Sequence, residues 1–276
     1  MNNRRMCSNC RAFIENKDKV CPYCDAPQTV PAAQTRGSGE VLGGFIPHAR
    51  FTTIMILLVN TALFAATLLA DMQRGSQSAL LSVSGPTLFQ FGAKLSEAVL
   101  HGQWWRLVTA GFLHGGMMHI LMNSWALMDL GSQVEELYGS RRLIVFYFVS
   151  TVFGFLASTY WSPSLSVGAS AGIFGLIGAM IALGVRNNNA MGSAIRGMYM
   201  RWAIYGLLFG LIPGFHIDNA AHIGGLVAGF AAAYIGGEPK LSGAMENVWQ
   251  VMAAMCLAIT AFCFLRMFFL MKGSGG

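Results

Sequence analysis

Residues 168–178 read Gly-Ala-Ser-Ala-Gly-Ile-Phe-Gly-Leu-Ile-Gly, a serine followed by apolar residues and closely spaced glycines. The apolar run continues to about residue 185 without a charged side chain. Such a run predicts a membrane-spanning helix, and glycines at this spacing let a neighbouring helix approach until the two backbones nearly touch. Residues 221–229, Ala-His-Ile-Gly-Gly-Leu-Val-Ala-Gly, repeat the pattern with a histidine near their start. We therefore expect two glycine-faced helices that pack against each other.

The rest of the chain is apolar as well. Of its 276 residues, 54% are hydrophobic and only 11% are charged. Continuous apolar runs indicate helices rather than strands, because every backbone polar group must be satisfied inside a bilayer. The expected fold is an all-α polytopic membrane protein with spans at roughly 51–70, 117–137, 143–161, 168–185, 201–215, 219–237 and 248–271.

The net charge of +6 is explained by where the basic residues lie relative to the predicted spans. Most Lys and Arg side chains fall in segments that these spans place on the same side as the N-terminus. The positive-inside rule then predicts a cytoplasmic N-terminus. The basic excess needs no anionic partner, and no nucleic acid is expected to bind.

Four cysteines near the N-terminus form two Cys-x-x-Cys pairs, Cys7 with Cys10 and Cys21 with Cys24. Two such turns present four thiolates tetrahedrally, so the pattern favours a structural zinc in a small ribbon. Disulfides are disfavoured because cytoplasmic thiols stay reduced. Metal-free or redox-active pairs are the alternative, since the spacer of ten residues between the pairs is short.

These features predict four segments. Residues 1–27 form the zinc-ribbon-like module, and 28–50 form a linker rich in Gly, Ala and Thr. Residues 51–237 form a six-helix core, and 238–276 add a cytoplasmic loop and a seventh membrane helix. The first fifty residues lack the apolar stretch of a cleavable signal peptide.

Polar residues inside the spans are candidates for chemistry, because ionisable groups are costly in a bilayer. His119 and Asn123 lie four residues apart and share one helix face. Each cluster alone has an ordinary alternative, namely helix packing through hydrogen bonds or small residues. If the two glycine faces meet, however, Ser170 and His222 lie at similar depth. A neutral imidazole can then take the serine proton, while His119, Asn123 and the Ser170 N–H can stabilise an oxyanion.

At this point the chain resembles the rhomboid family of intramembrane serine proteases. The resemblance rests on His114 and His119 with Asn123, the Gly-x-Ser at 168–170, and Ala-His-x-x-Gly-x-x-x-Gly from 221 to 229. Trp105-Arg106, and Glu135 with Gly139, fit as well, over residues 45–237 or so.

The resemblance implies a role for each matching residue. Ser170 is the nucleophile and His222 its partner in a dyad without an acid, which needs no cofactor. His119 and Asn123 match oxyanion-hole positions, His114 a neighbouring family histidine, and Phe174 an aromatic ring against the imidazole. The remaining matches are structural: Trp105, Arg106, Glu135, Gly168, Gly225 and Gly229. The layout is that of a six-helix core with one added helix.

Other residues bear on the catalytic assignment and on its alternatives. Ala171 follows the serine where many relatives have glycine, which adds a methyl group near the expected oxyanion hole. Asp218 lies four residues before His222 and is a candidate for orienting it. Asp129 is the only acid placed well inside a span, which disfavours an aspartyl protease, and no His-Glu-x-x-His motif for a metalloprotease is present. The main alternative is an inactive rhomboid-like adaptor or chaperone that binds transmembrane segments.

The resemblance also implies the substrates and the setting. Transmembrane proteins, single-pass or other, would enter past the fifth span, near Pro213 and Gly214. They would be cut in or near their membrane helix, in a site open to the outer face below the loop at 215–219. We expect a multi-pass protein of a bacterial inner membrane, in contact with lipids, whose zinc ribbon binds a cytoplasmic partner.

Overall fold

The computed structural model describes residues 4–7, 10, 13–15, 18–26, 50–212, 217–237 and 244–273. The chain divides into two compact units, residues 1–46 and residues 47–276, and each is described by itself. Of the expected linker at 28–50, residues 28–49 lie outside the described residues.

The small unit contains a two-stranded antiparallel sheet of β1 (Arg4–Met6) and β2 (Phe13–Glu15). Among its described residues, the buried side chains are Cys7, Ile14 and Cys21, with Cys24 packed against them. A core of this size buries too little apolar area to hold a fold, so another source of stability is required.

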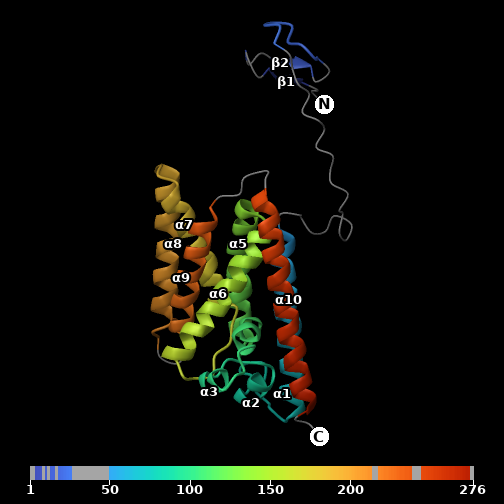
Figure 1. Ribbon diagram of the computed structural model, residues 1–276, viewed down its shortest axis with the longest axis vertical. Helices are drawn as coiled ribbons and strands as arrows, with labels where there is room; N and C mark the ends of the chain where they lie inside the picture. The colour runs from blue at the N-terminus through green and yellow to red at the C-terminus, as the bar shows by residue number, and fades with distance from the viewer. Residues whose placement is uncertain are drawn as a thin grey trace. The chain divides into compact units, whose positions relative to one another are not determined.

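The large unit is helical, as Figure 1 shows. The long helices run roughly side by side, and the short helices gather at one end. Their bounds are α1 (Phe51–Gln73), α2 (Gly85–Gln90), α3 (Ser96–Leu100), α4 (Arg106–Thr109), the 3₁₀ helix η2 (Ala110–Phe112), α5 (Met117–Tyr138), α6 (Ser140–Trp161), α7 (Ser170–Arg186), α8 (Ala190–Phe209), α9 (Asn219–Gly236) and α10 (Ala244–Gly273).

Among the residues that the structure describes, three helices are long and apolar enough to cross a membrane by length and composition alone, namely α1, α6 and α10 within 245–271. Helix α7 is equally apolar but has only 17 residues. The predicted helical membrane fold is confirmed, and the chain is a multi-pass membrane protein.

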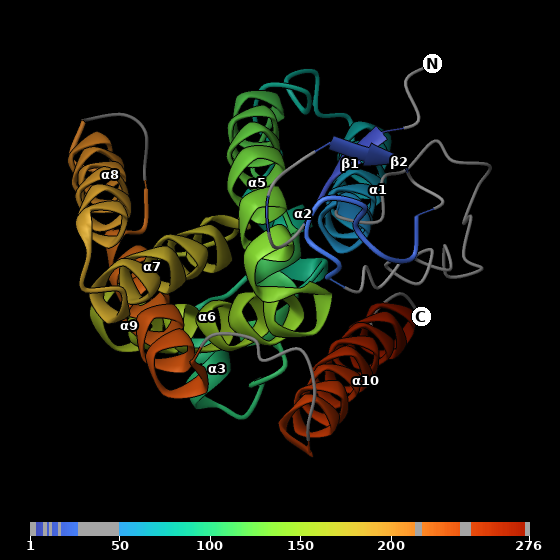
Figure 2. The same ribbon diagram turned by 90° about the horizontal axis from the view of Figure 1, so that it is seen from above.

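Helix α7 is the centre of the large unit. Its side chains are buried all round, from Ala171 to Gly184, as expected for a helix that is apolar on every face. Its most extensive contacts are with α9, α8 and α6. Seen from above, α7 lies among these helices and α5, whereas α10 lies at the periphery (Figure 2).

The fifth expected span is displaced. We expected it at 201–215, but α8 runs from 190 to 209. The helix begins after Asn189, whose side chain accepts a hydrogen bond from the Gly192 N–H at 2.8 Å, so a polar cap rather than hydropathy sets its start. Pro213 and Gly214, the expected break, lie outside the described residues.

The segment between α1 and α5 folds into the short helices, and its paired tryptophans differ in exposure. Trp105 is buried at 2% exposure. Its ring packs into the protein beside Val108 and Cys263. Trp104 remains half exposed and stacks on Phe262 of α10, with centroids 6.2 Å apart.

Candidate active site

Helix α5 begins at Met117 and carries His119 and Asn123 one turn apart on the same face. The Gly115 N–H donates to His119 Nδ1 at 3.3 Å, so the neutral ring carries its proton on Nε2. Asn123 Nδ2 donates one hydrogen to the His119 carbonyl at 3.0 Å and keeps a second. His114 is buried and packs edge-on against His119, with ring centroids 5.2 Å apart.

Ser170 is the first residue of α7, so its backbone N–H has no acceptor within the helix. Two residues earlier, Gly168 adopts φ +139°, which favours glycine. A Cβ atom at Gly168 would lie 2.8 Å from His119 Nε2 and 3.3 Å from Ser170 Oγ. The His119 ring and the Ser170 hydroxyl therefore face the same point of the backbone.

His222 lies in the first turn of α9 and is 6% exposed. Its ring stacks on Phe174, with centroids 4.1 Å apart and an angle of 10° between the planes. Within the described chain, the buried Nδ1 atom has no hydrogen-bond partner. Gly206 of α8 leaves room for this arrangement, because a Cβ there would lie 2.6 Å from Phe174 Cζ.

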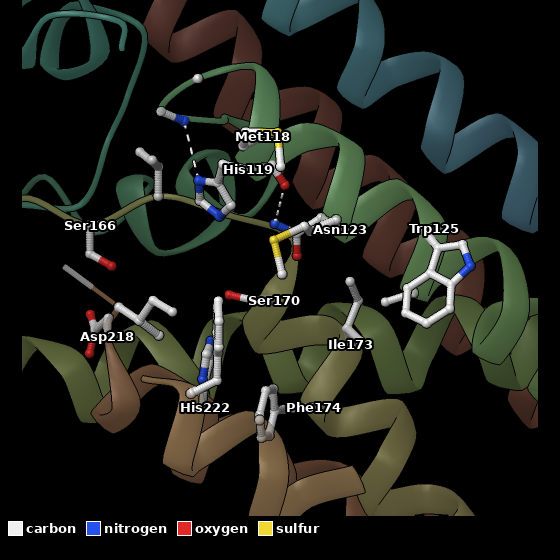
Figure 3. Close-up of a pocket in the computed structure, with 18 of the residues that line it drawn as sticks. Met118, His119, Asn123, Trp125, Ser166, Ser170, Ile173, Phe174, Asp218 and His222 are labelled. Atoms are coloured by element: carbon white, nitrogen blue, oxygen red, sulfur yellow. Dashed lines mark hydrogen bonds between the residues drawn. The ribbon is translucent and has the colours of Figure 1, made fainter. Parts of the chain in front are cut away.

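A cavity of about 690 Å³ joins these side chains. Ser170, His222, His119, Asn123 and Phe174 all line it. Figure 3 shows the Ser170 hydroxyl between His222 on one side and Asn123 on the other. The structure thus brings four of the sequence-predicted polar side chains, from three different helices, to one cavity, whereas the buried His114 does not line it.

Contacts through glycine hold α7 against α9. A Cβ at Gly225 would lie 2.1 Å from the Ala171 carbonyl oxygen, and a Cβ at Gly229 would lie 2.0 Å from that of Gly175. Both distances are far below an ordinary contact, so only glycine fits. Because Ala171 follows Ser170 and Gly225 lies one turn from His222, these contacts set how closely the two side chains approach.

The Ala171 methyl group does not lie near the cavity, contrary to our expectation. The residue is fully buried and clusters with Leu107, Phe155 and Ala221, away from the cavity. Gly154 of α6 makes the room, since a Cβ there would come within 2.9 Å of the Ala171 Cβ. The methyl group therefore fills a helix interface and does not narrow the cavity.

Asp218 caps the helix that carries His222. Its Oδ1 accepts a hydrogen bond from the Ala221 N–H at 3.1 Å, and its Oδ2 accepts one from the Ser158 hydroxyl. Asp218 and Phe174 lie on opposite sides of His222 in Figure 3. The hydrogen bonds of this carboxylate thus go to the helix end and to α6.

The residues expected to be structural make many contacts away from the cavity. Arg106 lies over the rings of Phe89 and Trp105 at 3.8 and 4.5 Å, and its Nη1 donates to the carbonyls of Phe89 and Ala93. At the opposite end of the helices, the Glu135 carboxylate accepts four hydrogen bonds at 2.7–2.9 Å. The donors are the Thr52 N–H, the Thr53 N–H, the Thr53 hydroxyl and the Ser140 hydroxyl.

Two charged groups outside the cavity have different surroundings. Asp129 is exposed and accepts a hydrogen bond from Gln133 on its own helix at 3.1 Å. Lys94 was not singled out from the sequence, yet its side chain is fully buried. Burial lowers the pKa of the Lys94 ammonium to about 8, although the Asp218 carboxylate acts in the opposite direction. Its partners are up to 70 residues away in sequence, so no spacing pattern reveals them.

In the small unit, the four cysteine sulfurs lie within 4.8 Å of one another. The Sγ atoms of Cys7 and Cys24 are 3.7 Å apart, as are those of Cys10 and Cys21. A Zn–S bond of about 2.3 Å gives a tetrahedron with edges of about 3.8 Å, whereas a disulfide requires about 2.05 Å. The four cysteines form no disulfide with one another, and their sulfurs have the spacing of a zinc site.

Comparison with known proteins finds similarity to rhomboid proteins. A model of the rhomboid domain matches residues 101–239. Rhomboid protease GluP of Bacillus subtilis is 36% identical over 178 residues, which are 64% of this chain and 35% of that protein. Rhomboid-like protease 2 of Toxoplasma gondii is 34% identical over 195 residues, 67% of this chain and 65% of the relative. A protein named inactive RHOMBOID-like protein 8, of Arabidopsis thaliana, is 32% identical over 162 residues, 57% of this chain and 46% of the relative.

Proposed function

The chain belongs to the rhomboid family, and we propose that it is an intramembrane serine endopeptidase with Ser170 as nucleophile and His222 as general base. One observation carries the proposal: the two side chains line one cavity with His119 and Asn123. The helices that carry them, α7 and α9, are in backbone contact through glycine. Relatives named as proteases support it, although the chain spans only 35% and 65% of two of them.

The chemistry follows from the placement of the donors. His222 takes the proton from Ser170 Oγ as the oxygen bonds to the substrate carbonyl carbon. The carbonyl oxygen becomes negative and accepts hydrogen bonds from His119 Nε2–H, the second Asn123 N–H and the Ser170 N–H. The imidazolium then protonates the leaving nitrogen as the C–N bond breaks, and water releases the acyl group by the reverse sequence.

No carboxylate orients the base in this proposal. The ring of His222 is fixed by stacking on Phe174 and by the first turn of a helix that Asp218 caps. Two nearly parallel rings with centroids 4.1 Å apart leave little rotational freedom for the imidazole. Catalysis by proton transfer then depends on packing rather than on a triad.

The test is cleavage of a single-pass model substrate by protein reconstituted in lipid vesicles. Ser170→Ala and His222→Ala should abolish cleavage, while Ser193→Ala, an exposed serine on α8 outside the cavity, should not change it. Cleavage by the first two variants at the wild-type rate would refute the dyad. If the wild type binds the substrate helix but no protein cuts it, the inactive adaptor is the better assignment, as the inactive relative suggests.

We also propose how the protein lies in its membrane. Ser170, His222 and His119 lie near the N-termini of α7, α9 and α5. Arg186 lies at the C-terminus of α7, and Arg141 and Arg142 follow the C-terminus of α5 in the first turn of α6. The positive-inside rule places the arginines in the cytoplasm and the cavity at the outer face, in a bacterial inner membrane. Substrates would enter past α8, where Trp125 and Trp202 stack at 6.2 Å in the cavity wall. Labelling of single introduced cysteines by an impermeant reagent tests the orientation.

For the small unit we propose a structural zinc held by Cys7, Cys10, Cys21 and Cys24, and a cytoplasmic protein partner. The sulfur spacing supports the metal, and zinc would supply the stability that the small core lacks. Purified protein should contain one zinc ion per chain, and the double variant Cys7→Ser, Cys10→Ser should lose it. Undiminished zinc in that variant would refute the site.

Residues 51–237 would then form the catalytic core, and residues 238–276 would add the peripheral helix α10.

A further inference from the structure

The fully buried cation Lys94 has no part in the mechanism above. It lies in the loop between α2 and α3, and its side chain reaches the last turn of α6. The ammonium donates to three carbonyl oxygens, those of Ser158 at 3.0 Å, Ser164 at 3.3 Å and Ser162. An ammonium has three hydrogens, so every donor is used, and the positive charge lies at the negative end of the α6 dipole.

The backbone of Lys94 holds the segment that leads to the nucleophile. The Lys94 N–H donates to the Ser166 carbonyl at 3.0 Å, and the Ser166 N–H donates back at 2.9 Å. The Gly168 N–H then donates to the Ala110 carbonyl at 3.0 Å, two residues before Ser170. Side chain and backbone of one lysine thus fix residues 162–166, and α7 begins four residues later.

A second connection runs from Lys94 to the histidine. Ser158 accepts the lysine through its carbonyl and donates its hydroxyl to Asp218. Asp218 in turn caps α9 at Ala221, the residue before His222, and its backbone carbonyl accepts the His222 N–H at 3.2 Å. The same carboxylate is the charge that raises the Lys94 pKa against the effect of burial.

We propose that Lys94 is a positioning residue for catalysis: it fixes the segment carrying Ser170 and the helix carrying His222 relative to each other through the carbonyls of α6 and through Ser158 and Asp218. This inference rests on the proposed Ser170–His222 dyad. Lys94 touches neither the cavity nor the dyad, so its effect is on geometry alone.

The test compares Lys94→Met with Arg74→Met in the full chain reconstituted in lipid. Arg74 is an exposed cation of the same outer region, bound to Thr87 and Gln90, so its variant controls for loss of charge. Two quantities are measured: kcat and KM on a single-pass substrate, and the rate at which a fluorophosphonate labels Ser170, with Ser170→Ala as the blank. The label reports how well the dyad is aligned without any substrate helix.

Displacement of reacting groups by about 1 Å costs about 100-fold in rate. Lys94→Met should therefore lose about 100-fold in both kcat and labelling rate, with KM close to wild type, and Arg74→Met should change neither rate. Labelling of Lys94→Met at the wild-type rate would overturn the proposal. A wild type that neither labels nor cuts would overturn the dyad itself, and this inference with it.

If Lys94→Met does not fold, Ser158→Ala decides the question. That variant removes the hydroxyl donated to Asp218 and keeps the carbonyl that Lys94 needs. A hydrogen bond to a charged group contributes enough to expect about a tenfold fall in labelling rate. An unchanged rate would overturn the proposed connection between Lys94 and His222.

Discussion

Gly225→Ala tests whether backbone contact between α7 and α9 sets the geometry of the site. The new methyl carbon would lie 2.1 Å from the Ala171 carbonyl oxygen, and an ordinary contact needs about 3.5 Å. The helices must therefore separate by about 1.4 Å. The contact adjoins Ser170 on one helix and lies one turn from His222 on the other, so this separation reaches the reacting groups directly.

The expected result is a fall in kcat of about 100-fold with a modest loss of stability. Overpacking of this kind costs about 1–3 kcal/mol, which lowers the melting temperature by about 2–12 °C in a protein of this size. Cleavage of a single-pass substrate in lipid vesicles measures kcat, and thermal unfolding in detergent measures stability.

Gly197→Ala is the matched control, because a Cβ on this α8 glycine would meet only the Arg201 side chain at 3.6 Å. It should leave kcat unchanged and stabilise the helix by a few tenths of a kcal/mol to about 1 kcal/mol. Wild-type kcat in Gly225→Ala, or equal losses in both variants, would refute the argument that glycine contacts position the dyad.

Three further changes test separate parts of the site. Glu135→Gln replaces an acceptor of four hydrogen bonds by an amide with one acceptor oxygen, and should cost about 2–3 kcal/mol, seen as a lower melting temperature with kcat retained. Phe174→Leu removes the ring stacked on His222 and should lower kcat by about tenfold without changing substrate binding; an unchanged kcat would mean that stacking does not orient the base. Trp202→Ala opens the cavity wall formed with Trp125 and should speed cleavage of a membrane-embedded substrate but not fluorophosphonate labelling; equal effects on both would argue against access past α8.

Much of the helical layout could be predicted from the sequence, because bilayer hydropathy and glycine spacing are local signals. The helices around Ser170 and His222 begin within about two residues of the expected positions. The position of α8 was predicted wrongly because Arg196 and Arg201 lower its hydropathy. Asn189, a residue type that favours the N-cap position, marks its true start. Hydropathy places the apolar part of a helix, whereas caps place its ends.

The candidate site could be predicted from the sequence only in part, for a different reason. His119, Asn123, Ser170 and His222 could be grouped because each stands near the start of an apolar run, so equal depth followed from topology. The partners of Lys94 are 64 to 70 residues away and are backbone carbonyls, which carry no sequence signal at all. The burial of the Ala171 methyl group depended likewise on Gly154 of another helix.

Inside a bilayer, burial of apolar surface does not hold helices together, because the lipid tails are as apolar as the side chains. Accurate placement of two reacting side chains then needs close van der Waals contact or fully satisfied hydrogen bonds. This protein has both, on opposite sides of the candidate dyad. On the membrane side of Ser170 and His222, glycine lets the backbones of α7 and α9 touch.

On the other side of the dyad, the buried Lys94 ammonium is saturated by carbonyls of the chain that precedes α7. A base without a carboxylate partner has no directional bond to correct an error in placement. Its orientation must come from rigid surroundings, and the two restraints supply this rigidity from independent parts of the fold. In the proposed dyad, the lack of an acid and the close packing around α7 are thus two aspects of the same structural solution.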